Sequence, residues 1–214
     1  MNNAGKVAEY IVVCREMGIE VLPPDINVGE GNFAVADGKI RYGMYAIKSI
    51  GRPVVDFIVT ERTAHGDYKT IEDFLKRVNG KEVNKRAVEN LIKAGALDGL
   101  DGNRHQMITV FPSVMDRISS DKKSSMAGQM TLFDIASDDV KEEFEIKMPD
   151  LPEYDKEEFL ALEKEVLGVY ISGHPLEKYT EILKKNVTAG CRDFMLDEET
   201  GKVAVADGAV VIVG

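Results

Sequence analysis

The chain has 214 residues, 44% of them hydrophobic, and a formal net charge of −10. This apolar content suffices for one or two compact domains, so the composition excludes a disordered chain. No apolar run approaches the roughly 18 to 20 residues of a membrane span, and the N-terminus has no signal core. We therefore expect a cytoplasmic protein with no membrane partner.

The charge is unevenly distributed along the chain. Residues 41–104 contain 12 Lys and Arg against 9 Asp and Glu, a net +3, whereas residues 129–165 contain 4 against 13, a net −9. Affinity for phosphates comes mainly from Lys and Arg, so the net negative charge of the whole chain argues against a nucleic-acid partner. The net positive charge of residues 41–104 is compatible with one. A solvated acidic linker beside an ordinary domain explains the acidic part equally well.

The first part of the chain predicts a helix and a small hairpin. Apolar residues at helical spacing indicate a helix over residues 6–17, which Gly18 ends. The pair Pro23-Pro24 then fixes an extended turn. Residues 33–42 alternate apolar and polar around Asp37-Gly38, a dipeptide suited to the two-residue turn of a β-hairpin.

A closely punctuated helical pattern follows. Pro53 suits the first turn of one helix, and Thr70 with Asp73 resembles the capping pair of a second. Asn84 can cap a third helix, which Gly95 ends. These signals predict several short helices that share one core.

The next segment begins with a helix and ends in a linker. Asn103 opens the helix, and Pro112 predicts a kink or a break within it. Between residues 119 and 150 the composition shifts to Ser, Asp, Lys and Glu, with one apolar cluster at residues 130–133. This composition indicates a mobile linker that carries one apolar peptide.

The last part of the chain predicts two helices and the start of a sheet. One helix is expected over residues 155–167, and Pro175 begins another that ends near Lys185. Residues 202–213 are rich in Val and interrupted by Asp207-Gly208, which indicates strands. We expect the remainder of that sheet to lie beyond Gly214.

A tight turn in the basic block has the form of a helix-hairpin-helix, with a helix expected on each side. Such a turn exposes backbone N–H groups at the N-terminus of its second helix to a phosphate oxygen, and the helix dipole favours the negative charge. Ser49 replaces the first of two glycines that the pattern usually carries, so packing of the two helices alone remains open. The candidate DNA-binding residues are Lys48, Ser49, Ile50, Gly51 and Arg52.

A looser copy of this turn follows between the helices that end at Gly95 and begin at Asn103. Its glycines are Gly95, Gly99 and Gly102, and Arg104 lies in the first turn of the next helix. Paired turns would bind both strands of a duplex better than one. Completion of a shared hydrophobic core is the alternative.

The apolar peptide of the linker is Gln129-Met130-Thr131-Leu132-Phe133. Its glutamine amide can donate and accept hydrogen bonds at one end, while the Leu-Phe pair fills an apolar pocket at the other. The alternative is that Leu132 and Phe133 pack back onto their own domain.

The residue types for catalysis or metal binding are not grouped in the sequence. Cys14 and Cys191 are far apart, and His174 precedes a proline-started helix, where a histidine is usually a cap or a turn residue. No nucleophile with a paired base, phosphate-binding loop or pair of magnesium-binding aspartates can be assembled. We therefore predict no active site, no metal site and no cofactor within this chain.

Four runs of sequence resemble, in order and spacing, the alpha subunit of bacterial DNA polymerase III. They are CREMGIEVLPPDIN at residues 14–27, IRYGMYAIKSIG at 40–51, NKRAVENLIKAGALD at 84–98 and EVLGVYISGHPL at 165–176. Four matches in sequence are far more specific than any single motif.

This resemblance implies a mainly α fold with small β elements and a division into five parts. They are the end of the fingers domain with the β-hairpin (1–42), a tandem helix-hairpin-helix domain over duplex DNA (43–119), an acidic linker (120–150), a helical connector (151–190) and the start of an oligonucleotide-binding (OB) domain (191–214). The peptide at residues 129–133 falls where the family carries its internal peptide for binding the sliding clamp.

The resemblance also implies a role in processive DNA replication without catalysis in this chain. The family's catalytic aspartates lie in the palm, upstream of Met1, so the parent polymerase and not this chain would use Mg²⁺. The expected partners are double-stranded DNA, the sliding clamp and, through the parent chain, other replicase subunits. Two alternatives stay open: a scaffold that only links the fingers to the OB domain, and a DNA-repair protein with similar hairpins.

Overall fold

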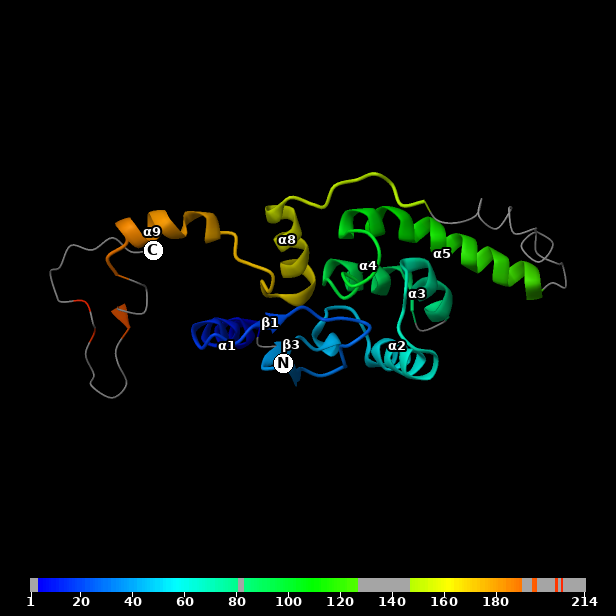
Figure 1. Ribbon diagram of the computed structural model, residues 1–214, viewed down its shortest axis with the longest axis horizontal. Coiled ribbons are helices and arrows are strands. Elements are labelled where there is room, and N and C mark those ends of the chain that lie inside the picture. Colours follow the sequence, from blue (N-terminus) through cyan, green and yellow to red (C-terminus); the bar gives the residue numbers. More distant parts are fainter. Residues whose placement is uncertain are drawn as a thin grey trace. The chain divides into compact units, whose positions relative to one another are not determined.

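The computed structural model describes residues 4–80, 83–126 and 147–189, together with Phe194, Met195, Val203 and Val205. The chain divides into two compact units between Ser172 and Gly173. The predicted fold class, mainly helical with small β elements, is confirmed (Figure 1). Within these described ranges no helix is long and apolar enough to cross a membrane.

A short helix and a three-stranded sheet begin the first unit. Its elements are α1 (Ala4–Glu16), β1 (Val21–Leu22), β2 (Ala34–Ala36) and β3 (Lys39–Arg41). The predicted hairpin is present: β2 and β3 are antiparallel, and Asp37 and Gly38 both have positive φ, as the favoured two-residue turn requires. The sequence did not predict that β1 pairs in parallel with β3, at Val21 and Ile40.

The described residues of the first unit contain six further helical segments. They are η1 (Met44–Ala46), α2 (Arg52–His65), α3 (Ile71–Val78), α4 (Lys85–Lys93), α5 (Arg104–Met126) and α8 (Lys156–Leu167). The predicted caps are confirmed: the Thr70 side chain accepts a hydrogen bond from Asp73 N at 3.0 Å, and Asn84 Oδ1 accepts one from Ala87 N at 2.9 Å. Gly95, with φ of 80°, follows the end of α4.

Two helix predictions are wrong in part. A single turn of 3-10 helix, η1, takes the place of the α-helix expected before the first tight turn. Of the kink or break expected at Pro112, the break is absent, because α5 runs through this residue to Met126 (Figure 1). A proline inside a helix costs about 3 kcal/mol, whereas each buried large apolar side chain contributes about 1.5–3 kcal/mol. The buried side chains of α5 around Pro112 are Val110, Phe111, Val114, Met115 and Ile118.

The hydrophobic core of the first unit lies between α2, α3, α4 and α5. Helices α3 and α4 both pack against α5, and α8 packs against α4. Each helix contributes one apolar face, as the spacing predicted, and the side chains least exposed to solvent include Ile58, Phe74, Leu75, Leu91, Ile92 and Met107. The loops that join these helices are thereby fixed in position.

The second unit contains η2 (Glu177–Tyr179) and α9 (Thr180–Asn186) among its described residues. The helix predicted from Pro175 therefore begins as a 3-10 turn. His174 is a turn residue, as expected: its Nδ1 accepts a hydrogen bond from Leu176 N at 3.2 Å. The expected OB strands and Cys191 lie largely outside the described residues.

Candidate nucleic-acid interface

The first tight turn, residues 47–51, is open to solvent. Lys48, Ser49, Gly51 and Arg52 are exposed, while Ile50 is buried at 8% exposure and anchors the turn in the core. Gly51 is the N-cap of α2. Among the residues that the structure describes, the amide N–H groups of Ser49, Gly51 and Arg52 have no hydrogen-bond partner. Three donors therefore remain available at a helix N-terminus, the arrangement that binds anions.

Ser49, and not Gly51, holds the left-handed backbone conformation of the turn. Ser49 has φ of 60°, whereas Gly51 is extended with φ of −76°. A residue without Cβ is favoured at the Ser49 position, which explains why hairpins of this kind usually carry a glycine there. The replacement preserves the turn.

The turn is tied to α4 and α8 by hydrogen bonds of Lys48. Its N–H donates to Val166 O at 2.8 Å, and its carbonyl accepts from Asn90 Nδ2 at 2.8 Å. The Lys48 ammonium donates to Glu165 O at 2.9 Å. These contacts fix the backbone of the turn before any ligand arrives.

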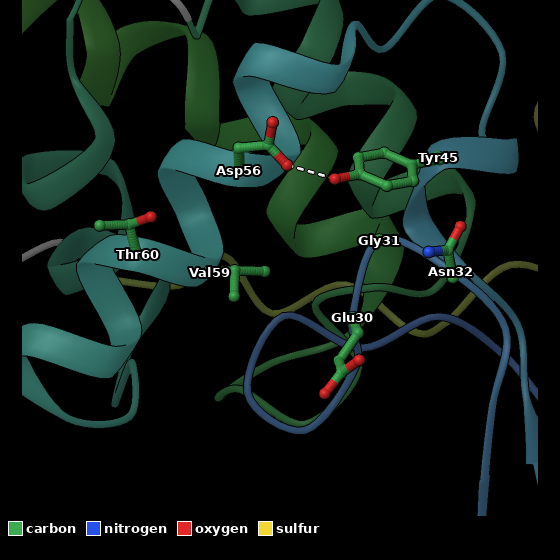
Figure 2. A pocket seen from close by; sticks show the side chains of 7 residues that line it. All are labelled: Glu30, Gly31, Asn32, Tyr45, Asp56, Val59 and Thr60. Carbon is green, nitrogen blue, oxygen red and sulfur yellow. Dashed lines mark hydrogen bonds between the residues drawn. The ribbon is translucent and has the colours of Figure 1, made fainter.

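Tyr45, the middle residue of η1, contacts Asp56 and Arg52 of α2 beside the turn. Its hydroxyl and the Asp56 carboxylate point toward one another and form a hydrogen bond (Figure 2), which is the main cause of the raised pKa of Tyr45. The Arg52 guanidinium lies over the Tyr45 ring, 4.8 Å from its centroid. An adjacent hollow of about 480 Å³ carries the carboxylates of Glu30 and Asp56, so it repels phosphate.

The second turn does not present Arg104 to solvent, which corrects the prediction that Arg104 contacts DNA. Arg104 is 1% exposed, and its guanidinium forms two hydrogen bonds with Asp98, at 2.8 and 2.7 Å. Further donors reach Lys93 O at 3.0 Å and Glu163 Oε1 at 3.4 Å, and the Phe159 ring centroid lies 3.9 Å from Arg104 Cζ. A guanidinium buried and paired in this way cannot reach a phosphate in solvent.

A carboxylate of the chain itself occupies the N-terminus of α5. Glu153 Oε2 accepts a hydrogen bond from Arg104 N at 3.0 Å, and Glu153 Oε1 accepts one from His105 N at 3.3 Å. The His105 ring stacks on Tyr154, with centroids 4.4 Å apart. The place where a helix-hairpin-helix would bind phosphate is therefore already filled.

Two of the three glycines of the second turn, Gly95 and Gly102, lie close against side chains of the chain itself. Gly95 has φ of 80°, and a Cβ added there would collide with the Arg104 guanidinium. A Cβ on Gly102 would lie 2.9 Å from Met148 Cε, whereas one on the exposed Gly99 would make only an ordinary contact, 3.6 Å from Asp25 Oδ2. The alternative weighed for this turn, completion of a shared core, fits these contacts better than DNA binding.

Sequence reasoning missed Glu163, which joins α8 to the second turn. Glu163 is fully buried and accepts hydrogen bonds from Ile171 N at 3.1 Å, from Ser172 N at 3.0 Å and from the Ser172 hydroxyl. Desolvation raises the pKa of the neighbouring Asp98, and this effect outweighs the lowering by the Arg104 guanidinium. The Asp98 side chain is partly exposed. The available signal was helical spacing, because Glu163 falls on the same face of α8 as Leu160 and Leu167.

The candidate clamp-binding peptide at residues 129–133 lies outside the described residues. Among the residues that are described, no group of three or more His, Cys, Asp and Glu side chains is arranged to hold a metal ion. The candidate interface thus consists of the first turn and what surrounds it.

Several known proteins resemble this chain in sequence. Residues 18–107 match the family model for the helix-hairpin-helix motif. Three proteins called DNA polymerase III subunit alpha are similar over most of the chain. The protein from Chlamydia pneumoniae is 40% identical over 84% of this chain, that from Borreliella burgdorferi 39% over 86%, and that from Deinococcus radiodurans 38% over 96%.

The chain belongs to the DNA polymerase III alpha subunit family. It spans 15%, 16% and 15% of the length of these three relatives, so it corresponds to one segment of an alpha subunit. The resemblance stated from four sequence runs is confirmed, as is the presence of a helix-hairpin-helix region.

Proposed function

We propose that this segment of an alpha subunit binds the backbone of duplex DNA through its first turn. The observation that carries the proposal is the set of free amides at Ser49, Gly51 and Arg52, at the N-terminus of α2, flanked by the exposed cations of Lys48 and Arg52. A phosphate oxygen accepts from the amides while the cations neutralise its charge.

The contact positions DNA without reading its sequence, because it reaches phosphate oxygens and no base edge. The Tyr45 ring beneath the Arg52 guanidinium limits the conformations of that side chain, so less entropy is lost when it binds. The acidic hollow at Glu30 and Asp56 disfavours a path of the backbone on the other side of Tyr45.

Fluorescence anisotropy with a short labelled duplex, measured over a range of salt concentrations, tests the proposal. Binding of the chain should weaken as salt rises, and Arg52→Gln should reduce affinity about tenfold, since a hydrogen bond to a charged group contributes about 1.5–3 kcal/mol. Lys69→Gln is the matched control, because Lys69 is an exposed cation outside the turn. Affinity that does not change with salt would leave only the scaffold role.

We also propose that Gln129, Met130, Thr131, Leu132 and Phe133 bind a sliding clamp. The peptide combines an amide with two adjacent large apolar residues in a strongly acidic segment, and the chain is related to replicative alpha subunits. Tethering to a ring would raise the local concentration of DNA, so that weak backbone contacts suffice for processive synthesis by the parent polymerase.

Clamp binding is tested by calorimetry with the purified clamp and the chain carrying Leu132→Ala and Phe133→Ala. Truncation of the two large apolar side chains of the peptide should abolish measurable binding. Val140→Ala, in the same acidic segment, is the control. Unchanged affinity of the double variant would contradict the assignment of this peptide.

A further inference from the structure

The C-terminal end of α8 is attached to the first turn. A helix leaves its last carbonyl groups without partners inside the helix. In α8, Val166 O accepts a hydrogen bond from the Lys48 amide at 2.8 Å, and Glu165 O accepts one from the Lys48 ammonium at 2.9 Å. The negative end of the helix dipole also favours an ammonium at this place. The turn is therefore held by α8 directly before Ser49.

Asn90 holds the opposite side of the same residue. It lies in the second half of α4, and its side-chain Nδ2 donates a hydrogen bond to Lys48 O at 2.8 Å. The amide and the carbonyl of Lys48 are thus both bound by other elements of the fold. Two hydrogen bonds from different helices fix the backbone of this one residue.

The Lys48 carbonyl and the Ser49 amide belong to one peptide group. This peptide bond is trans, and a peptide group is planar, so its C=O and its N–H point in opposite directions. Because Asn90 holds the carbonyl toward α4, the Ser49 N–H points away from α4. That N–H, on an exposed residue, is one of the three amides of the first turn that have no partner among the described residues.

Packing alone does not explain an asparagine at position 90. The side chain is only 7% exposed and lies on the buried face of α4 with Ala87 and Leu91. Asparagine forms helices less readily than leucine, and burial of an amide is unfavourable unless its hydrogen bonds to water are replaced. A leucine has nearly the same shape and would fill this space without either disadvantage. The hydrogen bond to Lys48 is therefore the property that distinguishes asparagine here.

We propose that Asn90 is a positioning residue for the DNA contact of the first turn. It touches no phosphate and acts through the Lys48–Ser49 peptide group, whose orientation it fixes so that the Ser49 N–H is directed outward before DNA arrives. A donor held in this way loses little freedom on binding, which raises affinity. This inference rests on the proposed DNA binding by the first turn.

Asn90→Leu tests this role in the 214-residue chain, because it removes the donor and keeps the shape of the side chain. Affinity for a labelled duplex should fall about three- to tenfold, since the hydrogen bond from the Ser49 amide to a charged oxygen is weakened. The slope of log affinity against log salt should not change, because no cation is removed, whereas Arg52→Gln should reduce it by about 0.9. In NMR spectra of the ¹⁵N-labelled chain, duplex should shift the Ser49 amide less in Asn90→Leu than in the wild type.

The matched control is Asn27→Leu, the same substitution at a site outside the first turn. Asn27 also donates through Nδ2 to a backbone carbonyl, Tyr68 O at 2.9 Å. This control should lose stability in thermal unfolding and still bind DNA as the wild type does. If Asn90→Leu does not fold, Asn90→Ala, which introduces no larger side chain, provides the same comparison.

Wild-type affinity of the folded Asn90 variant, together with weaker binding by Arg52→Gln, would overturn the role of Asn90 and leave the DNA contact of the first turn intact. An equal loss of affinity in Asn27→Leu would indicate general destabilisation and would also overturn that role. If the wild type binds duplex without salt dependence, the proposed function fails and the role of Asn90 fails with it.

Discussion

Glu153 and Arg104 meet at the first turn of α5, where the Glu153 carboxylate accepts a hydrogen bond from the Arg104 amide at 3.0 Å. The Arg104 side chain turns inward at the same point and pairs with Asp98. These two contacts show that the second turn holds parts of the fold together. The first turn remains the candidate for binding DNA.

Removal of the Glu153 cap should destabilise the chain. Glu153→Ala leaves the Arg104 and His105 amides without their acceptor, and loss of a helix cap costs typically about 1 kcal/mol. Glu153→Gln keeps an acceptor and should lose less. Urea unfolding followed by circular dichroism measures both changes, with Glu9→Ala, at an exposed position within α1, as a control. Wild-type stability of Glu153→Ala would show that the cap contributes nothing.

Arg104→Lys should lower the free energy of unfolding by several kcal/mol. An ammonium cannot match the planar fork that binds both Asp98 oxygens while also reaching Lys93 O, and each lost hydrogen bond to a charged group costs about 1.5–3 kcal/mol. The matched control is Arg86→Lys, an exposed position where stability should not change. If Arg104→Lys has normal stability but binds DNA more weakly, Arg104 contacts DNA and the structural role is wrong.

Ser49→Gly should stabilise the chain and keep DNA binding. Ser49 has φ of 60°, where glycine avoids a cost of about 1–2 kcal/mol, offset in part by the larger entropy of glycine in the unfolded chain. We expect a net gain of up to about 1 kcal/mol in thermal or urea unfolding. Ser49→Val, which is β-branched, should be destabilised. The reverse order of the two variants would contradict the geometry of the turn.

The stability of the first unit should fall at high pH because of Tyr68. Burial raises the pKa of Tyr68 to about 12, and its hydroxyl donates to Ile58 O at 2.9 Å. The folded state thus holds the phenol proton more tightly than the unfolded state, whose tyrosines have a pKa of about 10. The stabilisation is complete below about pH 10 and is lost as pH rises from about 10 to 12, by at most about 1.4 kcal/mol per pH unit.

Urea unfolding at a series of pH values measures this loss. Tyr68→Phe should be less stable at neutral pH by about 1 kcal/mol, because the hydrogen bond is gone, and should show a shallower decline above about pH 10. Identical declines in the wild type and the variant would show that Tyr68 does not carry the effect.

The sequence by itself determined the local structure and the family. Apolar spacing and short-range caps such as Thr70 and Asn84 predict where helices begin, and Asp37-Gly38 predicts the hairpin, because each signal acts between residues a few positions apart. The four sequence stretches that resemble the alpha subunit family identified the chain as a segment of an alpha subunit, and this identification also uses the sequence alone.

Only the tertiary structure decided which of the two turns is open. Arg104 and Gly102 have the residue types of a DNA contact, but Glu163 and Met148, both distant in sequence, occupy the space around them. Burial also decided that α5 continues through Pro112. The physical reason is that the solvent exposure and the ion pairing of a charged side chain depend on residues distant in sequence. The residues next to that side chain in the sequence therefore do not predict them.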